Sequence, residues 1–144
     1  MDWDETFGGY FWDEGYSVQQ TSDGGYIIVG LTYSFGAGQY DVYLIKTQPA
    51  GNLEFEQTFG GTGNDSAWSV RQTSDGGYII TGYTQSFGAG GNDVYLIKTD
   101  PGTELQWQKT YGGINNDAAY SVLQTLDGGY LITRRAEFHG LARG

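Results

Sequence analysis

The sequence lacks cysteine altogether and holds only 2 prolines in 144 residues. The absence of cysteine excludes disulfide bonds and thiolate metal sites, and it leaves the cellular compartment open. Proline this scarce argues against a disordered, low-complexity segment. No apolar run approaches the roughly 18 residues that a membrane-spanning helix requires. The acidic start, MDWDETFGG, shows no secretory signal peptide. The sequence therefore predicts no membrane segment, and it leaves the localisation unknown.

Basic residues are also scarce, with 7 lysines and arginines against 17 acidic residues and a formal net charge of −10. A surface of this charge repels phosphate backbones and anionic lipid, so neither nucleic acid nor a membrane is an expected partner. Three of the seven basic residues, Arg134, Arg135 and Arg143, lie in the last eleven positions. The tail 134–144 therefore differs in composition from the rest of the chain.

The residue types that catalysis uses are poorly represented. His139 is the only histidine, so a Ser-His-Asp triad would depend on this one residue of the tail. The glycine-rich loops lack the lysine and the following helix of a phosphate-binding loop. The acidic residues in 2–5 and 13–14 could pair as in a glycosidase, but a charged strand edge explains them equally well. The sequence predicts no catalytic residue, no cofactor and no enzyme activity, with a carboxylate-based, glycan-acting enzyme as an alternative.

A repeat dominates what is present. TSDGGYII occupies residues 21–28 and again 73–80, and TLDGGYLI follows at 125–132, at a constant offset of 52 residues. Residues 6–57 and 58–109 share 32 identities without a gap. A fixed period of this length indicates an architecture of repeated structural units. Most of the 25 glycines recur at the same positions of successive units, which is typical of a folded, turn-rich protein.

Each unit contains four short strand patterns and no helical period, which predicts an all-β fold. The first pattern alternates apolar and polar residues, and an Asp-Gly-Gly hairpin turn separates it from the second. The third is apolar on both faces, as in a sheet that is covered on both sides. In the second unit these strands are predicted at Trp68–Thr73, Tyr78–Thr84, Asp93–Thr99 and Leu105–Thr110.

Four antiparallel strands in about 50 residues are typical of a β-propeller blade. The unit also carries D-G-G-Y-[IL]-I, then S-F-G-A-G-x-x-D-V-Y-L-I-K-T, then an aromatic residue in the last strand. This pattern resembles the repeats of bacterial and archaeal β-propeller proteins and, more distantly, kelch-type blades. The resemblance extends to about Thr133. It implies a propeller fold and leaves the function open, because propellers serve as binding modules, scaffolds and enzymes.

The number of units does not close a propeller. The chain holds about 2.8 units, whereas a closed propeller needs ~4–8 blades. We predict a single domain, 1–144, made of a lone fourth strand at 2–7, blades at 16–59 and 68–111, a partial blade at 120–133, and the off-pattern tail 134–144. The sequence leaves open whether the tail adds a third strand to the partial blade or hangs free.

An open arc exposes the apolar faces of its end blades, which favours self-association. We predict a head-to-tail homodimer that closes a six-bladed ring, in which two blades are composites of both chains. A higher cyclic oligomer and a fragment of a longer repeat protein without independent activity are the alternatives. The predicted interface residues are Trp3, Phe7, Trp12, Tyr120, Tyr130 and Ile132.

The longer loops gather on one face of the predicted propeller, and such loops on a rigid scaffold often bind ligands. We predict a glycan or protein ligand there, although these glycine-rich loops are also needed to turn the chain between strands. Trp12 has no aromatic counterpart, since Asn64 and Asn116 stand at its positions in the other units. Trp12 can stack on a sugar ring or pack against a partner chain. The predicted ligand-binding residues are Tyr10, Phe11, Trp12, Asp13, Phe35, Asn64, Asp65, Phe87, Asn116 and Asp117.

The remaining repeated residues are predicted to be structural. The loops lack a D-x-D-x-D run, so their recurrent aspartates are expected to cap turns, and no metal site is predicted. The aspartates of the Asp-Gly-Gly motifs are expected to form hairpin turns. The recurrent strand aromatics are predicted to pack between blades. They are Tyr16, Trp68, Tyr120, Tyr26, Tyr78, Tyr130, Tyr43 and Tyr95.

Overall fold

The computed structural model describes residues 2–135, which form ten β-strands and no helix. No part of this range forms a helix of the length and hydropathy needed to cross a membrane. His139 and most of the tail lie outside the described residues. The strands are β1 Asp13–Gln20, β2 Tyr26–Thr32, β3 Asp41–Thr47, β4 Leu53–Phe59, β5 Asp65–Gln72, β6 Tyr78–Thr84, β7 Asp93–Thr99, β8 Leu105–Tyr111, β9 Ala118–Gln124 and β10 Tyr130–Arg135.

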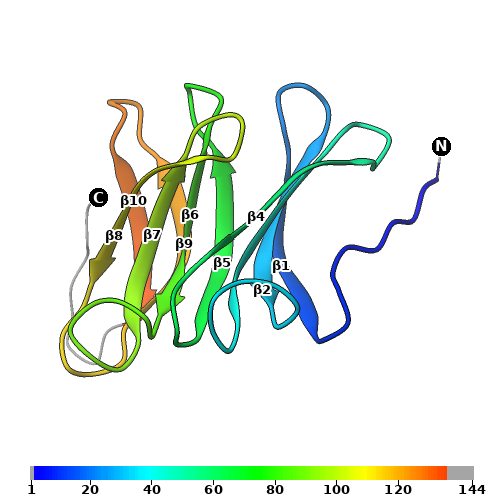
Figure 1. The fold of residues 1–144 in the computed structure, drawn as a ribbon. Coiled ribbons are helices and arrows are strands. Elements are labelled where there is room, and N and C mark those ends of the chain that lie inside the picture. Colours follow the sequence, from blue (N-terminus) through cyan, green and yellow to red (C-terminus); the bar gives the residue numbers. More distant parts are fainter. Residues whose placement is uncertain (1, 136–144) are drawn as a thin grey trace.

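The strands form three antiparallel layers in chain order (Figure 1). Sheet one has the order β1-β2-β3-β4, sheet two has the order β5-β6-β7-β8, and β9 and β10 form a hairpin. The first strand of each sheet begins three residues before the predicted start, at Asp13 and Asp65. The all-β prediction is confirmed, and four-stranded antiparallel sheets are consistent with propeller-like blades.

The turn between β1 and β2 has the structure that the Asp-Gly-Gly motif predicts. The Thr21 hydroxyl and the Gly25 N–H both donate to Asp23 Oδ1, at 2.5 and 3.0 Å. Gly24 adopts a φ of 86°, which glycine reaches without steric cost. The same contacts recur at Asp75 and Asp127, so the prediction that these aspartates form hairpin turns is confirmed.

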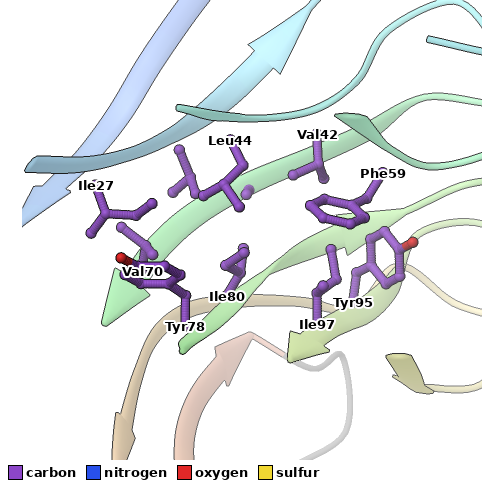
Figure 2. Close-up of a cluster of buried hydrophobic side chains, with 11 residues drawn as sticks. Ile27, Val42, Leu44, Phe59, Val70, Tyr78, Ile80, Tyr95 and Ile97 are labelled. Carbon is purple, nitrogen blue, oxygen red and sulfur yellow. The ribbon is translucent and has the colours of Figure 1, made fainter. Parts of the chain in front are cut away.

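The core lies between the layers. Every residue of β3 and of β7 is buried, which confirms that both faces of these strands are covered. Each fully buried valine, leucine or isoleucine side chain stabilises the fold by about 1.5–3 kcal/mol. Figure 2 shows the cluster in which side chains of the two sheets meet, made of Ile27, Val29, Val42, Leu44, Phe59, Ala67, Val70, Tyr78, Ile80, Tyr95 and Ile97. A second cluster joins sheet two to the hairpin through Ile79, Val94, Leu96, Ala119, Val122 and Ile132.

The lone strand predicted at 2–7 is not formed, because residues 2–12 contain no strand. None of the ten described strands pairs with this segment. The segment nevertheless packs where a preceding fourth strand would. Trp3 lies against Tyr26 with ring centroids 5.7 Å apart, and its repeat counterpart Trp107 lies against Tyr130 at 5.8 Å. Figure 1 shows the segment running along the free side of sheet one.

Candidate functional site

A cavity lies at the ends of β1, β2 and β6, where the long loops begin. Its volume is about 670 Å³. Six of its eight lining side chains are aromatic, and one is a carboxylate. We call this cavity the aromatic pocket; it is lined by Phe11, Trp12, Glu14, Tyr16, Leu31, Tyr33, Tyr40 and Tyr83.

Glu14 is held in place by two aromatic neighbours. The indole Nε1–H of Trp12 donates to Glu14 Oε1 at 2.6 Å, and the Tyr16 hydroxyl donates to Glu14 Oε2. Burial, reinforced by the Glu14 carboxylate, raises the pKa of Tyr16 to about 12. The phenol therefore stays protonated at neutral pH and acts as a donor to the carboxylate.

The pocket is also lined by tyrosines from both sheets. The hydroxyls of Tyr40 and Tyr83 are hydrogen-bonded to each other. Burial and this neighbouring phenol raise the pKa of Tyr83, which keeps the Tyr83 hydroxyl protonated at neutral pH. Tyr33 lies against Tyr40 with ring centroids 5.0 Å apart, and Trp68 lies against Tyr83 at 5.1 Å. This part of the lining is thus rigid and largely apolar, and the pocket spans the junction between the sheets.

A β-bulge directs Tyr16 toward the pocket. The register of β1 against β2 shifts between Gly15 and Ser17, which leaves Tyr16 without a partner in the ladder. Such bulges change the direction in which a side chain points. The same shift recurs at Trp68, whose ring stacks on Tyr120 at 5.0 Å. Tyr120 therefore packs between layers as predicted, although Tyr16 and Tyr120 both remain about half exposed.

The aromatic pocket is specific to the first unit. Although 32 of 52 positions are identical between the units, all seven lining residues that unit one contributes differ from their counterparts. Chance differences would be scattered over the unit, whereas these meet in one cavity. The pairs are Phe11 and Gly63, Trp12 and Asn64, Glu14 and Ser66, Tyr16 and Trp68, Leu31 and Tyr83, Tyr33 and Gln85, and Tyr40 and Asn92.

Only part of the predicted ligand-binding set lies in the pocket. Phe11 and Trp12 line it, and Tyr10 is almost fully exposed with its ring against Phe11. Phe35 and Phe87 instead pack on Tyr43 and Tyr95. Sequence reasoning missed the lining residues other than Phe11 and Trp12. These lining residues differ from their counterparts in the second unit, as Trp12 does, and this difference could have identified them.

The predicted loop aspartates hold the loops together. Asp13 Oδ2 accepts hydrogen bonds from the Gly9 N–H and the Ser34 hydroxyl, both at 2.8 Å, and Oδ1 accepts one from Thr32. Burial alone would raise the pKa of Asp13, but these hydrogen bonds outweigh it and lower the pKa. Asp65 makes the equivalent contacts, and Asp117 accepts from the Gly113 N–H. These carboxylates are engaged by their own loops.

The two asparagines of the predicted set are also placed by loops. Asn116 Oδ1 accepts a hydrogen bond from the backbone N–H of Asn92 at 2.9 Å. Asn64 is half-buried, and its side-chain oxygen has no hydrogen-bond partner. Neither residue lines the aromatic pocket, so the amides of units two and three do not extend it.

Two further carboxylates are buried at the starts of β3 and β7. Asp93 Oδ2 accepts hydrogen bonds from Ala89 and Gly90, whereas Oδ1 is buried without a partner. Burial, and to a smaller extent the charge of Asp117, raise the pKa of Asp93. Asp41 repeats this arrangement in sheet one. Within residues 2–135, no three or more histidine, cysteine or acidic side chains gather in a way that could hold a metal ion.

Only some of the predicted interface residues lie at the ends of the stack, since Tyr130 packs on Trp107 of sheet two. Trp3 and Phe7 lie on the free face of sheet one, where Phe7 borders a small cavity together with Tyr43 and Ile45. Tyr120 is half exposed, beside Trp68. The prediction for Ile132 is wrong, because this side chain is fully buried against sheet two. The apolar side chains that the hairpin does expose include Leu123, Leu126 and Leu131.

Comparisons with known proteins do not assign the chain to a family. No protein-family model matches the sequence, and no match was found among curated proteins. The functional inference therefore depends on two features described above, which are the aromatic pocket and the unequal exposure of the two end faces.

Proposed function

We propose that the protein is a non-enzymatic β-propeller module that closes a ring with a second copy and binds a glycan or protein ligand on its long-loop face. The observation that carries this proposal is the exposure of one repeated valine. Val70 and Val122 face the preceding layer and are 2% and 1% exposed, whereas their counterpart Val18 is 64% exposed. Val18 thus lies on a face built to be covered by a preceding blade.

The exposure is confined to the inner part of this face. Tyr43 and Ile45 on β3 are buried, and Phe7 lies beside them. Val18 on β1 remains exposed. Segment 2–7 therefore covers the part of the face where the fourth strand of a preceding blade would lie. The part that the first and second strands of that blade would cover stays exposed. The β9–β10 hairpin consists of those two strands and fits this vacant part of the face.

Repeated hydrogen bonds between the first strands of adjacent layers give the register of the contact. Ser17 Oγ accepts from the Val70 N–H, and Ser69 Oγ accepts from the Val122 N–H, both at 3.3 Å. The next step of the series would place the Val18 N–H of a second copy on Ser121 Oγ. A parallel series runs from the Ser22 N–H to Gln72 and from the Ser74 N–H to Gln124, both at 2.8 Å. Its continuation would join the Leu126 N–H to Gln20 of a second copy.

Two copies supply about five and a half blades, which suits a six-bladed ring with two composite blades. Head-to-tail contacts form a closed ring when the rotation from one copy to the next divides a full turn evenly. The long-loop face then carries one aromatic pocket per chain. The engagement of the loop carboxylates Asp13, Asp65 and Asp117 by their own backbone supports a binding role for this face rather than a catalytic one.

The test is the solution mass of the full chain by light scattering on a sizing column. We expect a mass near twice 15.7 kDa. Val18→Asp places a charge at the centre of the contact and should give a folded species of 15.7 kDa with unchanged circular dichroism. Ile114→Asp, an equally apolar-to-charged change in an exposed loop, should keep the larger mass.

A wild-type chain that is a cooperatively folded monomer would contradict closure by a second copy. A polydisperse series of masses would indicate instead that the chain is a piece of a longer repeat protein. In either case ligand binding by the aromatic pocket is measured separately, because one chain supplies all the residues that line it.

A further inference from the structure

We infer that the aromatic pocket binds an organic ammonium ion, such as the head of choline or a methylated lysine side chain. The inference rests on the proposed binding role of the long-loop face and names the chemical class of the ligand. It follows from the charge and size of the pocket and from the hydrogen bonds that already engage its lining donors.

Glu14 is the only charged side chain among the eight that line the pocket. It accepts hydrogen bonds from Trp12 and Tyr16, both uncharged donors, and no lysine, arginine or histidine is among the residues of 2–135 that line the cavity. A carboxylate surrounded by aromatic rings is stabilised by a cation that also contacts the ring faces. The net charge of −10 favours the approach of a positive ligand over a negative one.

The lining is poorly suited to a neutral sugar. Recognition of several hydroxyls requires free donors and acceptors, and polar groups without partners weaken binding. The hydroxyls of Tyr40 and Tyr83 bind each other, and the donors of Trp12 and Tyr16 are used by Glu14. The second unit has the amides Asn64, Gln85 and Asn92 at the positions of Trp12, Tyr33 and Tyr40. Unit one thus has aromatic rings where unit two has hydrogen-bonding amides.

The size of the pocket fits an ammonium head together with its alkyl chain. A volume of about 670 Å³ lies within the range of small-molecule sites. Six aromatic side chains, five from the first unit and Tyr83 from sheet two, line the pocket and offer ring surfaces to a ligand. Quaternary ammonium groups bind well to such arrangements, because their charge is spread over methyl surfaces.

The experiment is a calorimetric titration of the full chain with four probes. Choline is compared with 3,3-dimethyl-1-butanol, its uncharged isostere, and a short peptide with one trimethyllysine is compared with the unmodified peptide. We expect choline to bind at least tenfold more tightly than its isostere. Tighter binding of the trimethylated peptide than of choline would identify a protein side chain as the source of the ammonium group, and the reverse would identify a small molecule.

Variants in which pocket residues are replaced by their counterparts from the second unit test whether the probes bind in the aromatic pocket. Trp12→Asn and Tyr33→Gln introduce residues that the fold already accepts at the equivalent positions, and Glu14→Gln removes the charge alone. Each should weaken binding of the ammonium probes at least tenfold. Ile114→Thr is the matched control, because it replaces an exposed apolar loop residue by its own counterpart, Thr62, and should leave the affinity unchanged.

Equal affinity for choline and its isostere would overturn the inference, as would binding that Glu14→Gln and Trp12→Asn leave intact. A glycan panel run alongside separates this failure from that of the proposed function. A glycan whose binding depends on Trp12 would reject the ammonium class and keep the binding face. No binding of any probe would reject both, while the oligomeric mass tests ring closure independently.

Discussion

At the scale of single residues, buried lysines show how a charge is accommodated within the sheets. Lys98 is almost completely buried, and its Nζ donates to Asp75 Oδ2 at 3.0 Å, to the Thr99 carbonyl at 2.7 Å and to Gln106 Oε1 at 3.1 Å. Lys46 makes the corresponding contacts in sheet one. These contacts connect the first hairpin turn of each sheet to its last two strands, and they satisfy the buried ammonium group.

Removal of the Asp75 charge should weaken the fold mainly above pH 4. Hydrogen bonds from Thr73 and Gly77, together with Lys98, lower the pKa of Asp75 to about 2. Since this pKa lies below the unfolded value of about 3.9, the stabilisation is present above pH 4 and is lost as the pH falls toward 2. Because Asp75 is half exposed, we expect Asp75→Asn to lower the free energy of unfolding at pH 7 by about 1 kcal/mol.

Urea unfolding at pH 7, 4 and 2.5 measures this effect. The difference between Asp75→Asn and the wild type should shrink as the pH falls. Asp4→Asn, a change at an exposed carboxylate of the terminal segment, serves as the control. A difference that stays constant over the pH range would show that Asp75 acts through its turn hydrogen bonds and not through its charge.

At the scale of strands and loops, each sheet places a carboxylate at the start of its third strand. Asp93 is the first residue of the fully buried β7, and only one of its oxygens is hydrogen-bonded. Gly112 passes close to both Asp93 and Asp117, so a side chain at this position would meet the two carboxylates. Glycine is required here because the loop that ends β8 must pass these acids, and it does so with a φ of 153°.

Neutralising Asp93 should stabilise the fold at neutral pH. Its pKa is raised by burial and by Asp117, so folding favours the protonated form. The stability that Asp93 contributes is therefore present at low pH and declines as the pH rises from the unfolded pKa through the folded one. We expect Asp93→Asn to raise the free energy of unfolding at pH 7 by about 1 kcal/mol and to have little effect below pH 4.

The matched comparison is Asp65→Asn, which removes the charge from a carboxylate whose two oxygens are both hydrogen-bonded. That change should destabilise the fold at pH 7. Equal destabilisation by Asp93→Asn would show that the loop stabilises the charged form of Asp93. The pKa of Asp93 would then be lowered by folding, contrary to the prediction.

At the scale of the whole molecule, the three layers leave different surfaces at their two ends. The free face of sheet one exposes Val18, and the hairpin exposes Leu123 and Leu131. In the proposed ring, the hairpin of one copy covers the free face of sheet one of the other copy. The stability of the fold then depends on association. Thermal stability should then depend on protein concentration.

We expect the melting temperature of the wild type to rise as its concentration is increased from the micromolar to the hundred-micromolar range. Association removes folded chains from the unfolding equilibrium by mass action, whereas a monomer shows no such dependence. Differential scanning calorimetry at three concentrations measures the effect, and Val18→Asp should abolish it. A wild-type melting temperature that is independent of concentration would argue against association of the folded chains.

The elements of the fold could be predicted well from the sequence, because their causes are local. Alternating apolar residues, the Asp-Gly-Gly turns and the doubly apolar third strands depend on near neighbours in the chain. The constant period adds that successive units take the same structure. The strand predicted at 2–7 failed because a strand requires a partner, and the chain places none beside this segment.

The sequence by itself determined the strands, the turns and the order of the layers, since these follow from periodicity and from backbone preferences that act over a few residues. The tertiary structure decided where the functional surfaces lie. Trp12, Tyr40 and Tyr83 are far apart in the chain and meet only because sheet two packs against sheet one. The bulge that redirects Tyr16 and the exposure of Val18 likewise depend on which strands and layers are neighbours in space, which no local pattern encodes.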